Sequence, residues 1–200
     1  MMIPLLASSI VALAVILERA LQLRHKRVID PHLVETVNNI RTAKDVEMLF
    51  SVCQNSNSSL VNVIRAGLEN RYLPGNELKE LFEDSGRQEV RSLEKGLGAL
   101  ETVAASAPLM GLLGTVLGML KVFRVISEIG VGQASALSSG ISEALITTIF
   151  GLSIGIPALV AYNYFTHKAE DLVAEIEKCC IVLLHKLRAV NAGAKEDGRE

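Results

Sequence analysis

The sequence predicts an all-α membrane protein with three transmembrane helices and long helical cytoplasmic extensions. Half of its 200 residues are hydrophobic, and they gather in three long runs with almost no charge. Most of the 20 Lys and Arg and of the 22 Asp and Glu lie between or after those runs. Such segregation is typical of membrane spans that alternate with water-exposed segments, and not of a single soluble core.

The first apolar run extends from Ile3 to Leu17 and ends in Glu18-Arg19, so residues 1–23 are expected to form the first transmembrane helix. The run is short for a hydrocarbon layer about 30 Å thick. We therefore expect the Arg19 side chain to extend toward the interface so that the helix can cross. A secretory signal peptide is the alternative, but it carries its positive charge before the apolar stretch, whereas here the basic residues follow it.

The second and third runs are longer. Thr102 to Leu120 contains no charged residue, and residues 99–126 are expected to form the second span. The third span is expected over residues 134–165, with Glu143 as its one Asp, Glu, Lys or Arg, after a short loop at 127–133. At about 1.5 Å per residue, both runs are long enough to cross the hydrocarbon layer.

Residues 24–98 and 166–200 carry the amphipathic patterns expected of cytoplasmic helices. Before the second span, apolar residues recur at helical spacing in two groups: Leu33, Val37 and Ile40, then Leu60, Ile64 and Leu68. A helix after the turn at Pro74 is expected to run unbroken into the second span. After the third span, the stripe Leu172, Ile176, Leu183 and Leu187 needs a partner surface, either on the chain's own helices or on neighbouring subunits.

The distribution of basic residues predicts the orientation. Lys and Arg concentrate between Arg24 and Lys95 and again from Lys168 onward, which places these segments in the cytoplasm by the positive-inside rule. The N-terminus and the 127–133 loop are then periplasmic. Lys121 and Arg124, at the opposite end of the second span, count against this orientation without reversing it.

Composition argues against several other classes of protein. The net charge of −2 and the absence of Trp leave no basic surface with stacking side chains for nucleic acid. Cys53 stands alone, while Cys179 and Cys180 are adjacent on a helical pattern where a disulfide is hard to form. The four histidines form no ligand pattern, so we expect no metal and no cofactor. No nucleophile with a base and no phosphate-binding loop is present, so no catalytic residue is assigned.

Small residues line one face of the second and third spans and predict close helix contacts. Pro108 is expected to kink the second span. The helix-packing candidates are Pro108, Gly111, Gly114 and Gly118 in the second span and Gly151 and Gly155 in the third. Such patterns occur both in ordinary helix packing and in pores, so both readings stay open.

Glu143 is the residue most indicative of function. A carboxylate at membrane depth costs about 2.5–3.5 kcal/mol on insertion scales, so another interaction must offset that cost. Ser139 and Thr147 are one helical turn away on the same face. The carboxylate could serve a proton or ion path, or it could be a structural group satisfied across a helix interface.

Two long motifs make the sequence specific. The segments APLMGLLGTVLGM, from Ala107 to Met119, and GISEALITTIFGL, from Gly140 to Leu152, resemble the second and third spans of the MotA/TolQ/ExbB proton-channel family. Glu18-Arg19 and the segment Arg65 to Leu68 are weaker matches. MotA-type members have four spans, so three spans favour the ExbB/TolQ branch, with ExbB as the nearest type and TolQ as the alternative.

The resemblance implies a subunit of a proton-driven motor in the bacterial inner membrane. Five copies would enclose two single-span helices of an ExbD- or TolR-like partner, whose intramembrane aspartate takes and releases protons. Motion would pass to a TonB- or TolA-like protein. By motif position Glu143, Thr115 and Thr148 match the family's polar pore residues. Thr147 leaves open which hydroxyl faces the pore, although the motif alignment selects Thr148.

Overall fold

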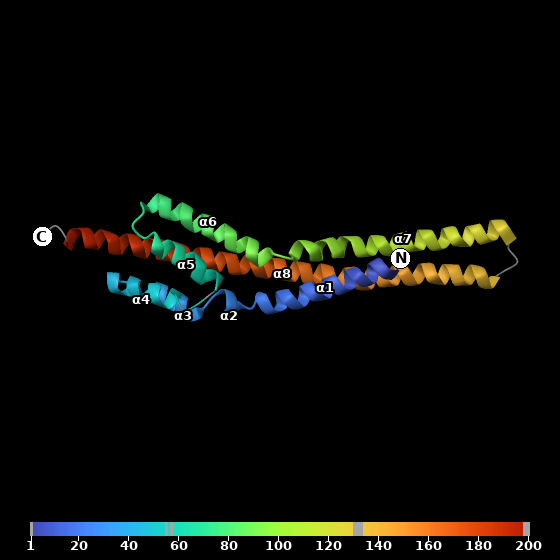
Figure 1. The fold of residues 1–200 in the computed structure, drawn as a ribbon, viewed down its shortest axis with the longest axis horizontal. Coiled ribbons are helices and arrows are strands. Elements are labelled where there is room, and N and C mark those ends of the chain that lie inside the picture. Colours follow the sequence, from blue (N-terminus) through green and yellow to red (C-terminus); the bar gives the residue numbers. More distant parts are fainter. Residues whose placement is uncertain (1, 55, 57, 130–133, 198–200) are drawn as a thin grey trace. The chain divides into compact units, whose positions relative to one another are not determined.

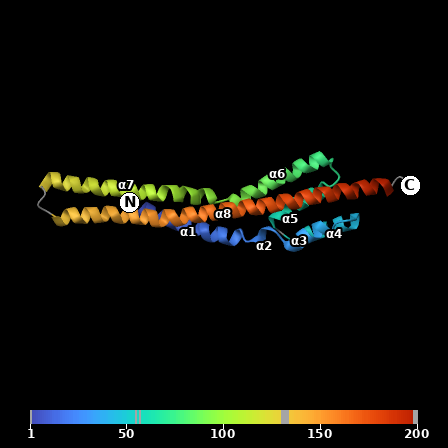
Figure 2. The same ribbon diagram turned by 180° about the vertical axis from the view of Figure 1, so that it is seen from behind.

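The computed structural model describes residues 2–54, 56, 58–129 and 134–197, which form eight helices and no strand (Figures 1 and 2). The helices are α1 (Met2–Gln22), α2 (His25–Val28), α3 (Pro31–Asn39), α4 (Ala43–Gln54), α5 (Ser59–Glu69), α6 (Gly75–Glu94), α7 (Leu97–Ile129) and α8 (Ala134–Asp197). The chain divides into a first unit, Met1–Arg19 with Gly96–Thr166, and a second unit, Ala20–Lys95 with His167–Glu200. The all-helical fold class is as predicted.

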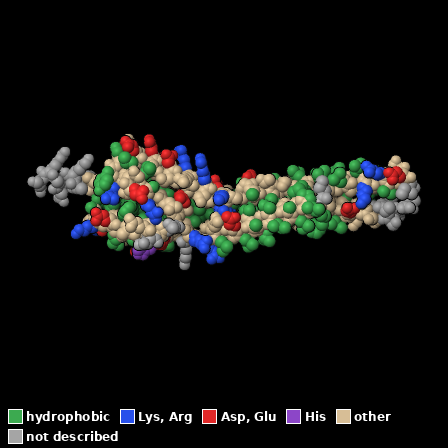
Figure 3. Space-filling view, in the orientation of Figure 1, with side chains coloured by type: hydrophobic (Ala, Val, Ile, Leu, Met, Phe, Trp, Pro, Cys, Tyr) green, Lys and Arg blue, Asp and Glu red, His purple; other side chains and the backbone are tan. Residues whose placement is uncertain are grey.

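The first unit contains the three apolar runs. Helices α1, α7 and α8 are each long and apolar enough to cross a membrane. In the most apolar 18-residue stretch of each helix, only 17%, 22% and 28%, respectively, is buried in the single chain. Hydrophobic side chains accordingly dominate the visible surface of this unit, whereas the charged side chains gather mainly over the second (Figure 3). The exposed apolar surface of the first unit is available to lipid or to other membrane helices.

Two of the helices are longer than the spans expected within them. Helix α7 continues to Ile129, so the first three residues of the expected loop are helical, while residues 130–133 lie outside the described part of the chain. Helix α8 is one continuous helix across the expected boundary between residues 165 and 166. Helix α7 also continues through Pro108 without ending.

The expected unbroken helix from Pro74 into the second span is wrong. Helix α6 ends at Glu94, and Gly96 adopts a φ of +84° before α7 begins at Leu97. Only glycine adopts this left-handed conformation at little cost, which explains why the helix breaks there. A Cβ atom added at Gly96 would also lie 3.8 Å from the Nε of Arg19.

The Arg19 side chain, expected to extend toward the interface, is buried against the chain's own helices. Its side chain is 1% exposed, and Nη2 donates to Glu18 Oε1 at 3.1 Å. Burying a guanidinium inside the first unit is tolerable only because it is paired. The Glu18-Arg19 motif thus has a structural role at the end of α1.

In the second unit, local capping sets the helix starts. Thr42 and Asp45 cap α4 reciprocally, since the Asp45 carboxylate accepts from the Thr42 N–H at 2.8 Å. The backbone N–H groups of Arg41 and Thr42 hold the pKa of the Asp45 carboxyl below its usual value. Ser58 caps α5 by accepting from the Val61 N–H at 3.3 Å, and Asp30 caps α3.

The motif that begins at Arg65 has a structural explanation. The Arg65 guanidinium donates to the carbonyls of Cys53 and Ser56, and so binds the chain where α4 ends and its carbonyls lack helical partners. Gly67 lies directly under the Phe82 ring of α6, with no room for a Cβ. The motif therefore joins α4, α5 and α6.

The apolar stripe of the C-terminal part of α8 packs on the chain's own helices. Leu172, Ile176, Leu183 and Leu187 are all buried. Two polar contacts add to this packing: His25 Nε2 lies 2.9 Å from Glu175 Oε2, and Asn191 Nδ2 donates to the Arg71 carbonyl at 2.9 Å. Of the two alternatives for the stripe, the structure supports packing within one chain.

Candidate functional site

Helices α7 and α8 meet along a seam of small residues in the first unit. On α7, a Cβ at Gly111 would lie 3.0 Å from the Thr147 carbonyl oxygen, and one at Gly118 would lie 2.7 Å from the Ala144 Cβ. Gly114 lies directly against the Thr147 side chain. These positions admit no larger side chain because the facing helix already occupies the space.

The glycines of α8 fit the same seam from the other side. A Cβ at Gly151 would lie 2.6 Å from the Ala107 carbonyl oxygen, and one at Gly155 would lie 2.6 Å from Cγ of Pro108. The small-residue faces of the two spans thus satisfy each other within one chain. They do not by themselves require a second subunit.

The three candidate threonines have different surroundings. Thr147 is 6% exposed, and its hydroxyl donates to the Ala144 carbonyl at 2.7 Å. Thr148 donates across the seam to the Gly111 carbonyl at 3.1 Å, and Thr115 donates to the Leu112 carbonyl of its own helix at 2.6 Å. Each hydroxyl is held by a backbone carbonyl, so each threonine keeps its lone pairs available as acceptors.

Glu143 forms an ion pair between the two helices. Its Oε2 lies 3.1 Å from the Nζ of Lys121 on α7, and the side chains are 63% and 68% exposed, respectively. The pair lies where the charge-free run of α7 ends. A cation from the neighbouring helix would offset the cost of a carboxylate at membrane depth.

A cavity of about 680 Å³ lies beside this ion pair. Its lining includes Glu143, Ser139, Ser142 and Thr147 from α8, Lys121 from α7 and Met2 from α1. The expected clustering of Glu143 with Ser139 and Thr147 on one face is therefore present, and the carboxylate borders an open cavity.

Thr115 and Thr148 do not line this cavity. Residues four apart on a helix differ by about 40° in direction, but residues five apart differ by about 140°. Glu143 and Thr147 consequently share a side of the seam, and Thr148 points to the other side. Within a single chain, the structure does not bring Glu143 together with Thr115 and Thr148.

Lys121 is the residue that sequence reasoning missed as part of the site. In the sequence it stands out only as a basic residue at the end of the second expected span. The signal was available, because an acid within one span and a base at the end of the adjacent span can pair across the helix interface.

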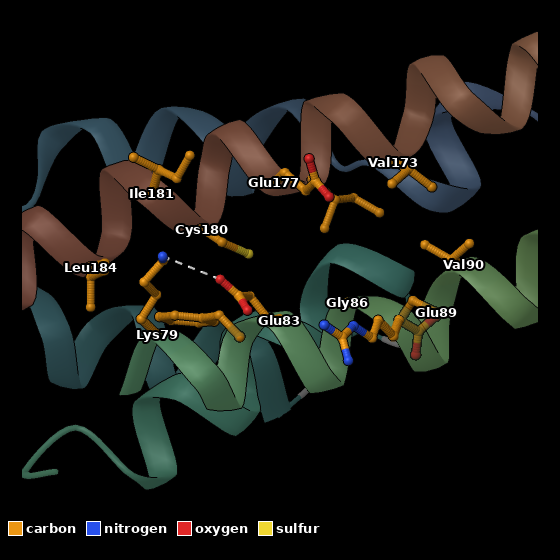
Figure 4. Close-up of a pocket in the computed structure, with 13 residues that line it drawn as sticks. Lys79, Glu83, Gly86, Glu89, Val90, Val173, Glu177, Cys180, Ile181 and Leu184 are labelled. Carbon is orange, nitrogen blue, oxygen red and sulfur yellow. Dashed lines mark ion pairs between the residues drawn. The ribbon is translucent and has the colours of Figure 1, made fainter. Parts of the chain in front are cut away.

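A second cavity, of about 390 Å³, lies between α6 and α8 in the second unit (Figure 4). Its floor is apolar, with Val90, Val173 and Ile181 among its lining, and Lys79 and Glu83 form an ion pair of 3.4 Å at its rim. None of the candidate residues of the ion path lines it. No group of three metal-ligating side chains occurs among the residues that the structure describes.

Comparison with known proteins identifies the family. Residues 55–178 match the model of the MotA/TolQ/ExbB proton channel family. The chain belongs to this family. The match includes the seam between α7 and α8 and the Lys121–Glu143 pair, and it confirms the resemblance seen in the sequence.

Individual relatives support the ExbB/TolQ branch. The chain is 33% identical over 153 residues to an ExbB homologue of Methanothermobacter thermautotrophicus, covering 76% of this chain and 53% of the homologue. It is 34% identical over 127 residues to the Tol-Pal system protein TolQ of Pseudomonas aeruginosa, covering 58% of this chain and 55% of TolQ. It is 36% identical over 115 residues to the biopolymer transport protein ExbB of Aquifex aeolicus, covering 57% and 76% of the two chains. The chain thus spans about half the length of the first two relatives.

Proposed function

We propose that this chain is the channel subunit of an ExbB-like motor that uses the proton motive force across the inner membrane to power TonB-dependent transport across the outer membrane. The observation that carries the proposal is the Lys121–Glu143 pair beside an open cavity, in a chain of the MotA/TolQ/ExbB family. The carboxylate accepts and releases protons, and the partner chains convert that cycle into movement. Neither step needs a cofactor.

The exposure of the ion pair supports assembly with other chains. Lys121 and Glu143 remain more than half exposed in one chain, although they adjoin the apolar runs. Charged groups facing lipid are costly, so such side chains usually face the interior of a helix bundle or a water-filled space. We propose a ring of five copies that encloses two single-span helices of an ExbD-like partner. The partner would pass the motion to a TonB-like protein.

Native mass spectrometry of the detergent-extracted complex tests this proposal. We expect a homo-oligomer, with five copies as the main species, that retains a single-span companion. A monomer without a companion would contradict the ring and favour a passive membrane scaffold, in which the Lys121–Glu143 pair is only structural.

A TolQ-like role in the Tol-Pal envelope system is the second candidate, supported by the 34% identity to the Pseudomonas aeruginosa TolQ. The companion recovered in the same experiment discriminates the two, because a TolR-like chain would favour the Tol-Pal role. Deletion of the gene separates them further: loss of TonB-dependent uptake indicates the first role, and loss of envelope integrity the second.

We also propose that the N-terminus and the 127–133 segment face the periplasm and that the C-terminus is cytoplasmic. The native thiols are poor probes of this topology, because burial raises the pKa of Cys53 and Cys179 to about 11 and that of Cys180 to about 12. They should stay protonated and unlabelled at neutral pH. New cysteines are therefore needed at exposed sites.

Ser127→Cys on α7 and Gln88→Cys on α6 provide such sites, since both residues are exposed. In intact spheroplasts a membrane-impermeant maleimide should label Ser127→Cys, and it should label Gln88→Cys only after permeabilisation. The unmodified protein is the control, and it should remain unlabelled in both conditions. The reverse pattern would invert the proposed orientation.

A further inference from the structure

The cation that pairs with Glu143 lies on a different helix, and its place in the site suggests a role beyond offsetting charge. Lys121 Nζ approaches Glu143 Oε2 to 3.1 Å, and both side chains line the same cavity. A salt bridge in bulk water contributes little. At the end of membrane-spanning runs, however, each charge would be costly alone, so the pair should persist.

The groups around Glu143 would otherwise suit a metal cation. Its carboxylate shares the cavity with the hydroxyl-bearing Ser139 and Ser142, and hard cations prefer oxygen ligands of these kinds. The Lys121 ammonium occupies one carboxylate oxygen and brings a fixed positive charge to the same place. A sodium ion would have to displace the ammonium or bind beside it, against electrostatic repulsion.

We propose that Lys121 is a positioning and specificity-determining residue: it holds the Glu143 carboxylate at the wall of the cavity and excludes metal cations from it, so that the path conducts protons alone. This inference rests on the proposed function as a proton-driven channel. Lys121 acts through Glu143, so it is not itself a carrier of protons.

Ion flux through the reconstituted complex tests the proposal. The complex, isolated with its companion chain, is placed in proteoliposomes, and uptake of radioactive sodium is measured beside proton flux. Wild type and Lys121→Arg, which keeps the cation, should show no sodium uptake above that of protein-free vesicles. Lys121→Gln should raise sodium uptake about tenfold. The proposal would be overturned if a folded Lys121→Gln complex took up no more sodium than the wild-type complex.

A charge exchange tests the ion pair without relying on transport. Lys121→Glu and Glu143→Lys should each lower the thermal stability of the complex, and the double variant should recover most of the loss because the pair is re-formed with opposite polarity. If the stability losses of the two single variants simply add in the double variant, the proposal is overturned. This test holds even if the Lys121→Gln complex fails to assemble. Absence of proton flux in the wild-type complex would instead count against the proposed function, and the exchange experiment would still decide whether the pair exists.

Discussion

Glu143→Gln should abolish proton-driven energy transduction while leaving the complex assembled. The amide keeps the shape of the side chain, and its oxygen can still accept from Lys121, whose Nζ lies 3.1 Å from Glu143 Oε2. It cannot ionise, so it cannot take up and release a proton. We expect transduction to fall by at least about 100-fold, the scale of losing a positioned proton-transfer group.

The measurements are energy-dependent uptake in cells whose own copy of the gene is deleted, and size-exclusion chromatography of the extracted complex. Glu128→Gln is the matched control, because Glu128 is also an exposed glutamate, near the C-terminal end of α7, but does not line the cavity. It should retain full activity. Unchanged activity in Glu143→Gln would show that the carboxylate is structural and would support the scaffold reading.

The fold was largely predictable because each signal that determines it is local. Long charge-free runs define the three long apolar helices, and 3.6-residue periodicity defines the buried face of α3, α5 and the C-terminal part of α8. The break between α6 and α7 was not predicted, since an isolated glycine is compatible with a continuing helix. Only the positive φ of Gly96 in the structure shows that the helix is interrupted at this glycine.

The site was predictable only in part, because it depends on which helix faces lie against each other. Glu143 and Thr147 stood out as polar residues on one face of one span. The contribution of Lys121 depends on the register between α7 and α8, and the sequence of a single helix does not contain that register. The same limit applies to Thr148, whose hydroxyl reaches the Gly111 carbonyl across the seam.

Gly151→Ala should destabilise the protein markedly, because its methyl group would collide with backbone atoms. The added Cβ would lie 2.6 Å from the Ala107 carbonyl oxygen and 2.9 Å from the Gly111 Cα. A flexible side chain could rotate away, but backbone can yield only if α7 moves as a whole. Overpacking of this kind costs about 1–3 kcal/mol.

Movement of α7 should also affect the ion path. The Thr148–Gly111 hydrogen bond and the Lys121–Glu143 pair both join α7 to α8, so a wider or shifted seam would weaken them together. We therefore expect Gly151→Ala to lower both the melting temperature and the proton flux. A loss of about 2 kcal/mol corresponds to a fall of roughly 4–8 °C in a chain of this size.

Gly98→Ala is the matched control, because it makes the same substitution in α7 at a position where no atom lies within 4 Å of the new Cβ. Alanine favours the helix by about 0.5–1 kcal/mol relative to glycine, so this variant should be as stable as wild type or slightly more so. Thermal unfolding in detergent, followed by circular dichroism, gives both values. Equal melting temperatures for the two variants would show that α7 and α8 do not approach as closely at Gly151 as the contacts indicate. A lower melting temperature with undiminished proton flux would instead show that the seam stabilises the chain without holding the ion path in register.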